Sequence, residues 1–305
     1  MHIFPRLLAA AALTLAAAPL AAQVGAPAAS APVAAQDADP ALWVVRDADT
    51  TIYLFGTVHM LRPGLSWFDE AVADAFAASD ELVLELPAGS DARVGELVTG
   101  LSSAQDGITL SARLSPEQRD IYTRAMARMH LPAAPFEARE PWMPAMLLSV
   151  VPLIQRGYNP TDGVEATLTA AGTAAGKRIS GLESADIQIG FFDSMAIDTQ
   201  VDFLVSSAAA ALSGEDSLAP MIDQWAAGDP DRLGALMNAE LASSPELARI
   251  LLTDRNANWA EWIRLRLAEP GGRYFVAVGA GHLAGTGSVQ QMLFAQGIIA
   301  TRVAY

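Results

Sequence analysis

The chain has 305 residues, contains no cysteine and carries a formal net charge of −15. Without cysteine it can form no disulfide, no thiolate nucleophile and no Cys-ligated zinc site. The excess of 34 Asp and Glu over 19 Lys and Arg argues against binding to nucleic acid or to an anionic membrane surface.

The N-terminal part predicts export. Residues 1–22 combine a basic start, an apolar core and a small-residue end, as a secretory signal peptide does. Residues 23–38 are rich in Ala, Pro and Ser, which is typical of a disordered tether. We therefore expect a periplasmic or secreted protein whose globular part is 39–305. Residues 144–154 are apolar but too short for a bilayer, so we expect no transmembrane span in the mature chain.

The first predicted elements are two strands and a helix. The apolar runs 42–46 and 51–55 flank a short polar turn and predict a hairpin. The second run continues directly into Gly56-Thr-Val-His59. Ser66 is expected to cap the helix that follows.

A further strand is predicted over residues 81–87, where Pro87 would end it. Glu85 lies near the end of this strand. The pattern fits equally an exposed carboxylate and a functional one, because a buried carboxylate would need a partner.

Residues 90–265 are predicted to be mostly helical. Ser115-Pro-Glu-Gln118 is a capping box that opens a helix, and His130 near its end is expected to face solvent or the helix dipole. Asp162-Gly-Val-Glu165 opens another helix. Residues 177–183 predict a third core strand, with Glu183 just beyond its end.

The C-terminal part returns to a sheet. Residues 274–278 predict a strand that ends in Gly279-Ala-Gly281-His282. A helix over 286–296 with Gly297 as its C-cap and a strand over 298–303 follow. The chain thus predicts an α/β fold, with a mixed central sheet built from N- and C-terminal segments and a large helical insertion at about residues 90–265.

Two histidines follow predicted strands in the same way. His59 and His282 each lie three residues after a glycine that ends an apolar run. One such histidine would more often be structural, but the pair favours a function. Ligand sites in α/β sheets collect past the carboxyl ends of strands, so two parallel neighbours would bring both imidazoles to one point, with Glu85 from a third strand.

Two neutral imidazoles and a carboxylate are ligands suited to a divalent transition metal such as Zn²⁺, Mn²⁺ or Co²⁺. A metal of this kind activates water for hydrolysis. Glu165 or Glu183 would serve as a further ligand or general base, although each also fits a solvated carboxylate. The sequence has no His-Glu-x-x-His, no Gly-x-Ser-x-Gly and no Walker loop.

Several motifs occur in a fixed order from about Leu42 to the C-terminus. They are Leu42-Trp43, Tyr53-Leu-Phe-Gly-Thr-Val-His59, Glu81-Leu-Val-Leu-Glu85-Leu-Pro87, Lys177 with Gly181-Leu-Glu183, Arg255-Asn256 before Trp259, and Val278-Gly-Ala-Gly-His-Leu283. In these motifs the chain resembles the TraB/GumN family, which is related to the Tiki metalloproteases and to plasmid pheromone-shutdown proteins. The resemblance implies a role for His59, His282, Glu85 and the pair Arg255 and Asn256. Tiki-like members are regarded as divalent-metal peptidases.

The predicted function is an exported, divalent-metal-dependent hydrolase, with a peptidase acting on a peptide or other small substrate as the preferred interpretation. His59, His282 and Glu85 would hold the metal and its water, Arg255 would stabilise the oxyanion, and Asn256 would position substrate. The alternative is a binding protein that sequesters a peptide, haem or a metal without turnover. A role in exopolysaccharide production would depend on the GumN name alone.

Overall fold

The computed structural model describes residues 35–241 and 245–305. The predicted signal peptide at 1–22 and most of the predicted tether lie outside these residues. The last residues of the tether, 35–38, are described. Of these, Gln36–Asp37 form strand β1, which pairs in parallel with β4 (Leu65–Ser66).

No helix in the described part of the chain is long and apolar enough to cross a membrane.

The described residues fall into two compact units, and residues 89–158 with 185–218 form the first, here called the helical unit. Its core contains the stacked rings of Phe192 and Phe203. The capping box at Ser115 is present as predicted, and the exposed His130 follows the helix it opens. The elements of the helical unit are α3 (Asp91–Leu101), α4 (Leu110–Arg113), α5 (Pro116–Arg128), η1 (Ala134–Phe136), α6 (Trp142–Gln155), α8 (Ala185–Asp193) and α9 (Ile197–Ser213).

Residues 35–88, 159–184 and 219–305 form the second unit, here called the sheet unit. Its central sheet has six strands in the order β6-β5-β7-β3-β2-β8. The first four run parallel, whereas β2 is antiparallel to both β3 and β8. This confirms the predicted mixed sheet, the predicted hairpin and the contribution of both ends of the chain. The strands are β2 (Leu42–Arg46), β3 (Thr51–Thr57), β5 (Glu81–Leu84), β6 (Arg178–Gly181), β7 (Arg273–Gly279) and β8 (Thr301–Arg302).

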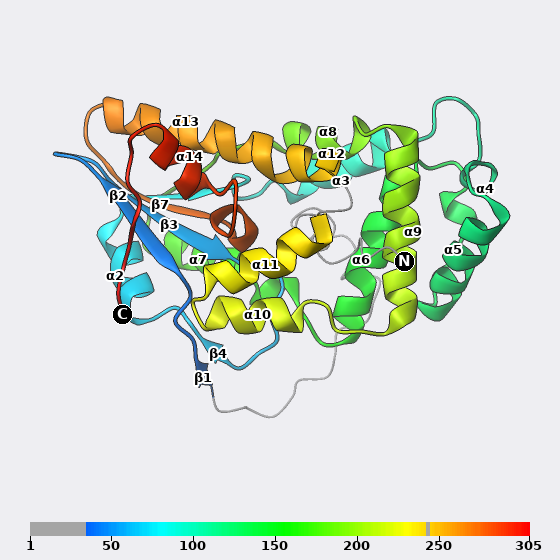
Figure 1. The fold of residues 1–305 in the computed structure, drawn as a ribbon, viewed down its shortest axis with the longest axis horizontal. Coiled ribbons are helices and arrows are strands. Elements are labelled where there is room, and N and C mark those ends of the chain that lie inside the picture. The colour runs from blue at the N-terminus through cyan, green and yellow to red at the C-terminus, as the bar shows by residue number, and fades with distance from the viewer. Residues whose placement is uncertain (1–34, 242–244) are drawn as a thin grey trace. The chain divides into compact units, whose positions relative to one another are not determined.

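Helices cover both faces of this sheet (Figure 1). Strand alternation sends Leu54 and Val276 to one face, where they pack in a buried cluster with Trp259 of α13 and Leu293 of α14. The other face carries aromatic rings, and Phe275 packs there on the rings of strand β3 and helix α2. The helical elements of the sheet unit are α2 (Glu70–Ala78), η2 (Pro160–Asp162), α7 (Val164–Ala174), α10 (Ala219–Ala226), α11 (Pro230–Leu241), α12 (Pro245–Ala248), the π-helical turn η3 (Arg249–Thr253), α13 (Asp254–Ala268), η4 (Ala280–Leu283) and α14 (Val289–Ala295).

The prediction that Ser66 caps the first helix is wrong. Ser66 belongs to strand β4, and its hydroxyl donates a hydrogen bond to Asp69 Oδ2 at 2.6 Å. Asp69 is the N-cap, and the helix begins at Glu70. The backbone of Ser66 is engaged by β1 through the Ala38 N–H, so it cannot turn into a helix there.

Other predicted elements also differ in place or extent. The strand at 177–183 is an edge strand, not a core strand, because β6 pairs with β5 on one side and its residues are exposed or half-buried. Helix α14 begins at Val289, three residues later than predicted, because Gly285 and Gly287 adopt positive φ before it. Gly297, with φ of 79°, follows its end as predicted.

Candidate functional site

Each of the four parallel strands is followed by a residue of one polar cluster. His59 follows β3, Glu85 follows β5, Glu183 follows β6, and His282 follows β7. Strands β3 and β7 are parallel neighbours, which is the condition that the expected meeting of the two histidines required. Because carboxyl ends of parallel strands share one edge of the sheet, four segments far apart in sequence deliver their side chains to the same place.

The two histidines and Glu85 meet beside Gly279, the last residue of β7. A β-carbon at Gly279 would lie 3.2 Å from Glu85 Oε1, 3.6 Å from His282 Cδ2 and 3.7 Å from His59 Nε2. Gly279 also donates its backbone N–H to Glu85 Oε1 at 2.7 Å. The predicted convergence of His59, His282 and Glu85 is therefore present, and a side chain at position 279 would intrude on it.

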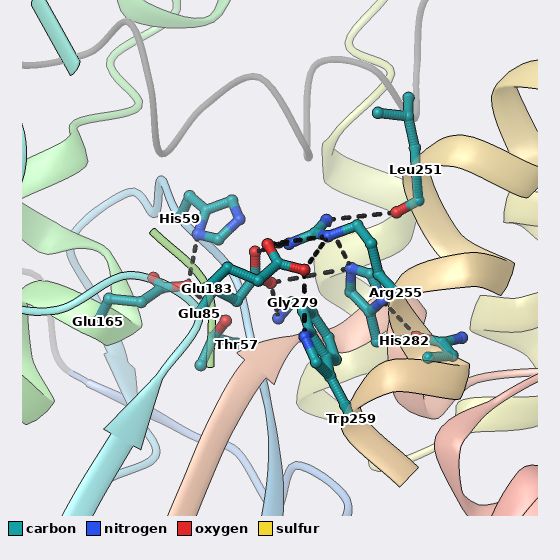
Figure 2. A network of polar contacts seen from close by, with 11 residues as sticks. Thr57, His59, Glu85, Glu165, Glu183, Leu251, Arg255, Trp259, Gly279 and His282 are labelled. Carbon is teal, nitrogen blue, oxygen red and sulfur yellow. Dashed lines mark hydrogen bonds and ion pairs between the residues drawn. The ribbon is translucent and has the colours of Figure 1, made fainter. Parts of the chain in front are cut away.

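Arg255 of α13 is the centre of the hydrogen-bond network (Figure 2). Its Nη2 donates to Glu85 Oε2 at 2.6 Å and to Glu183 Oε2 at 2.9 Å. Its Nε donates to Glu183 Oε1 at 2.9 Å. Its Nη1 donates to the Leu251 carbonyl at 3.2 Å and lies 3.2 Å from His282 Nε2. All five guanidinium N–H groups thus face an acceptor.

Trp259 is a member of this network that the sequence analysis missed as a site residue. Its ring is buried in the core, and its Nε1 donates to Glu183 Oε1 at 3.1 Å. The same ring lies 4.7 Å from the Arg255 guanidinium and 4.3 Å from the His282 ring. Its spacing of four residues from Arg255 on one helix was the available signal, because i and i+4 share a face.

His59 is paired with Glu165 of α7. Its Nδ1 lies against Glu165 Oε1, which also accepts a hydrogen bond from the Thr57 hydroxyl. The start of α7 is held close to β3, because the Val164 N–H donates to the Val58 carbonyl at 3.0 Å. A β-carbon at Gly163 would lie 2.2 Å from the His59 carbonyl oxygen, so only glycine permits this approach. Thr57 was also missed, although it stands two residues before His59 in the same motif.

His282 is oriented by Asn256. The Asn256 amide donates from Nδ2 to the Gly287 carbonyl at 2.8 Å, which turns Oδ1 toward His282 Nδ1 at 2.6 Å. This assigns the proton of the neutral ring to Nδ1, so that Nε2 carries the lone pair facing Arg255. Asn256 is thereby a positioning residue for the second histidine.

The pKa values of the two imidazoles are shifted in opposite directions. Burial, followed by the Arg255 charge, lowers the pKa of His282 to about 3, so this ring is neutral at physiological pH. Burial also opposes protonation of His59, but the Glu165 carboxylate outweighs it and raises the pKa of His59 above its usual value. Burial would raise the pKa of Glu85, but Arg255 and then the histidines hold it well below its usual range.

The donor atoms of His59, His282 and Glu85 are of the types that bind divalent metals. Glu85 Oε1 and His282 Nε2 are 3.8 Å apart, and His59 Nε2 faces the same point beside Gly279. As the side chains stand, no group of three or more His, Asp or Glu within the described ranges is arranged to hold a metal ion. Arg255 lies against His282 Nε2 and binds the other oxygen of Glu85.

Charge also favours a cation at this place. With neutral imidazoles, the cluster holds the three carboxylates of Glu85, Glu165 and Glu183 and one guanidinium: Glu85 and Glu183 pair with Arg255, and Glu165 lies against His59. A proton on His59 offsets part of this excess, and a divalent ion would offset it more fully.

The fold and the cluster define a class of α/β protein in which parallel strands carry two Gly-x-x-His motifs and buried glutamates to one edge of a sheet. Comparison with known proteins identifies the family: the chain matches the TraB/PrgY/gumN family over residues 41–302 and belongs to it. It is 25% identical to the protein YbaP of Escherichia coli (strain K12), which is described as uncharacterized, over 254 residues that make up 83% of this chain and 92% of YbaP. The similarity to YbaP of Shigella flexneri has the same extent. No solved structure matches the chain.

Proposed function

We propose that the protein is an exported, divalent-metal-dependent hydrolase that cleaves peptides. The observation that carries this proposal is the meeting of His59, His282 and Glu85 beside the Gly279 backbone, at the carboxyl edge of the sheet. The resemblance to Tiki-type metallopeptidases in the same residues supports the peptidase assignment. The predicted signal peptide supports export to the periplasm or beyond.

The metal would be held by His59 Nε2, Glu85 Oε1 and His282 Nε2, and Zn²⁺, Mn²⁺ and Co²⁺ suit these donors. Such an ion lowers the pKa of bound water and polarises a carbonyl. For His282 to be a ligand, Arg255 Nη1 must give up its contact with His282 Nε2.

The residues of the chain also supply orientation. Glu165 lies against Nδ1 of His59, which leaves Nε2 as the ring nitrogen available to the proposed metal. Because the N–H groups of Arg255 are engaged by protein acceptors, we assign this residue to positioning Glu85 and Glu183 and not to direct contact with an oxyanion. Asn256 holds His282 and lines a neighbouring pocket.

Metal analysis of purified protein tests the site. We expect close to one transition-metal ion per chain in the wild type, and loss of that ion in His59→Ala, His282→Ala and Glu85→Gln. His130→Ala is the matched control, because His130 is exposed and belongs to the helical unit. Equal metal content in all variants would reject the proposed ligands.

Incubation with a mixed peptide library tests turnover. Cleavage that a chelator and Glu85→Gln both abolish supports the hydrolase. The pairing of Glu85 and Glu183 with Arg255 favours the second candidate, a sequestering protein, because neither carboxylate is then free to activate water. Saturable binding of peptide, haem or metal without products would support that alternative and contradict the hydrolase.

A further inference from the structure

A pocket of about 410 Å³ opens beside His282 in the sheet unit. Its walls come from α11, α12, the π-helical turn η3, the first turn of α13 and the loop after η4. Met237, Leu252 and Ala284 supply apolar surface, and Thr253 and Asn256 supply hydrogen-bonding groups. Its volume lies in the range of roughly 300–1,000 Å³ typical of small-molecule sites.

Two residues that line the pocket adjoin the second histidine. Asn256 lines the pocket and binds His282 Nδ1 with its side-chain oxygen. Gly281 lines the pocket and directly precedes His282 in the chain. A group bound in this pocket would therefore lie next to the second histidine and not at a remote surface.

The lining also has a charge preference. None of the described residues that form the pocket is charged, although carboxylates and a guanidinium lie just beyond Asn256. A charged group entering the pocket would lose hydration without gaining a partner, which is costly. An aliphatic or thioether side chain would gain contact area instead.

The pocket can also adjust its size. Met237 lies so close to Gly281 that a β-carbon there would be 1.9 Å from Met237 Cε. The thioether end of methionine is flexible and adapts to different apolar shapes. The Met237 side chain therefore forms a movable part of the pocket wall. It packs against Gly281, which has no side chain to exclude it.

We propose that this pocket is the subsite for an uncharged, aliphatic or thioether side chain of the peptide substrate, adjacent to the cleaved bond. The position of this subsite next to a cleaved bond rests on the proposed function, whereas binding of the side chain in the pocket does not. Thr253 and Asn256 would face the polar backbone of the bound residue, and Met237 and Leu252 its side chain.

Equilibrium binding of blocked amino acids tests the subsite without any turnover. The probes are N-acetyl-leucine amide, N-acetyl-methionine amide, N-acetyl-lysine amide and N-acetyl-aspartate amide, measured by ligand-detected NMR on full-length protein with a chelator present. We expect the two uncharged probes to bind at least tenfold more tightly than the two charged ones. Glu85→Gln should leave this order unchanged, because Glu85 does not line the pocket.

Three variants sharpen the test. Leu252→Lys puts a charge on the half-buried pocket wall and should weaken N-acetyl-leucine amide at least tenfold while favouring the aspartate probe. Leu265→Lys makes the same change at an exposed position of α13 and should alter neither, and Leu252→Met should keep the wild-type order. Equal binding of all four probes, or no effect of Leu252→Lys in folded protein, would overturn the subsite. Discrimination without cleavage of any peptide would keep the subsite and reject the hydrolase.

Discussion

The replacement Arg255→Met gives the most direct test of how the site is held together. Arg255 is 3% exposed, and it is the cation that pairs with the buried side chains of Glu85 and Glu183. Methionine keeps much of the aliphatic volume beside Trp259 but removes the charge and every donor. Both carboxylates would then be buried without their counter-charge, and an uncompensated buried charge strongly destabilises the fold.

The expected loss of stability is about 3–5 kcal/mol at pH 7, the cost of removing one partner of a buried pair. The pH dependence follows from the pKa of Glu85. In the wild type this pKa is held below its usual range, so the pair stabilises the fold above the ordinary carboxyl pKa and this contribution is lost as pH falls below it. In the variant, burial without Arg255 raises the pKa of Glu85 above its unfolded value. The variant therefore gains stability relative to the wild type as pH falls from 7 toward 5.

Urea unfolding followed by far-UV circular dichroism at pH 7 and pH 5 measures both effects. The double variant Arg255→Met/Glu183→Gln should recover part of the loss, because one orphaned charge is removed. Arg273→Met is the control, since Arg273 pairs with Asp80 at the surface and exposed pairs contribute little. A loss below about 1 kcal/mol for Arg255→Met, or a loss that does not change with pH, would refute the role given to Arg255.

Three further outcomes follow from individual contacts. Glu165→Gln removes the charge that raises the pKa of His59, so the His59 titration followed by NMR should move to lower pH; an unchanged titration would contradict the pairing. Gly163→Ala places a methyl group against the His59 carbonyl and should cost about 1–3 kcal/mol in urea unfolding, whereas wild-type stability would show that α7 can move away freely. Asn256→Leu leaves the N–H at His282 Nδ1 without its acceptor and should lower the free energy of unfolding by about 1–3 kcal/mol. A loss near zero would show that another group accepts this hydrogen bond.

The sequence was sufficient to predict the centre of the site because that part depends on strand ends. An apolar run that ends in glycine defines where a buried strand stops, and His59 and His282 each follow such a run. Parallel pairing of neighbouring strands then determines that both residues reach the same edge. Glu85 followed from the same rule, since β5 pairs with β7 on its other side.

The sequence was not sufficient for residues whose placement depends on tertiary packing. Ser66 has good capping chemistry, but pairing of β4 with β1 takes its backbone into a strand. Nothing in the local pattern shows that β1 exists, because its partner lies about thirty residues later in the chain and each strand has only two residues. A preference for a helix cap is worth about 1 kcal/mol, which tertiary contacts easily exceed.

Trp259 shows why a core prediction and a site prediction do not exclude each other. Its spacing predicts a buried helix face, and the ring is indeed buried against the sheet. The indole N–H of Trp259 donates to Glu183, which satisfies this buried donor. Glu183 in turn accepts hydrogen bonds from Arg255. The ring that completes the core therefore also fixes the carboxylate that holds the guanidinium, so the packing of α13 on the sheet and the geometry of the polar cluster are one structural requirement.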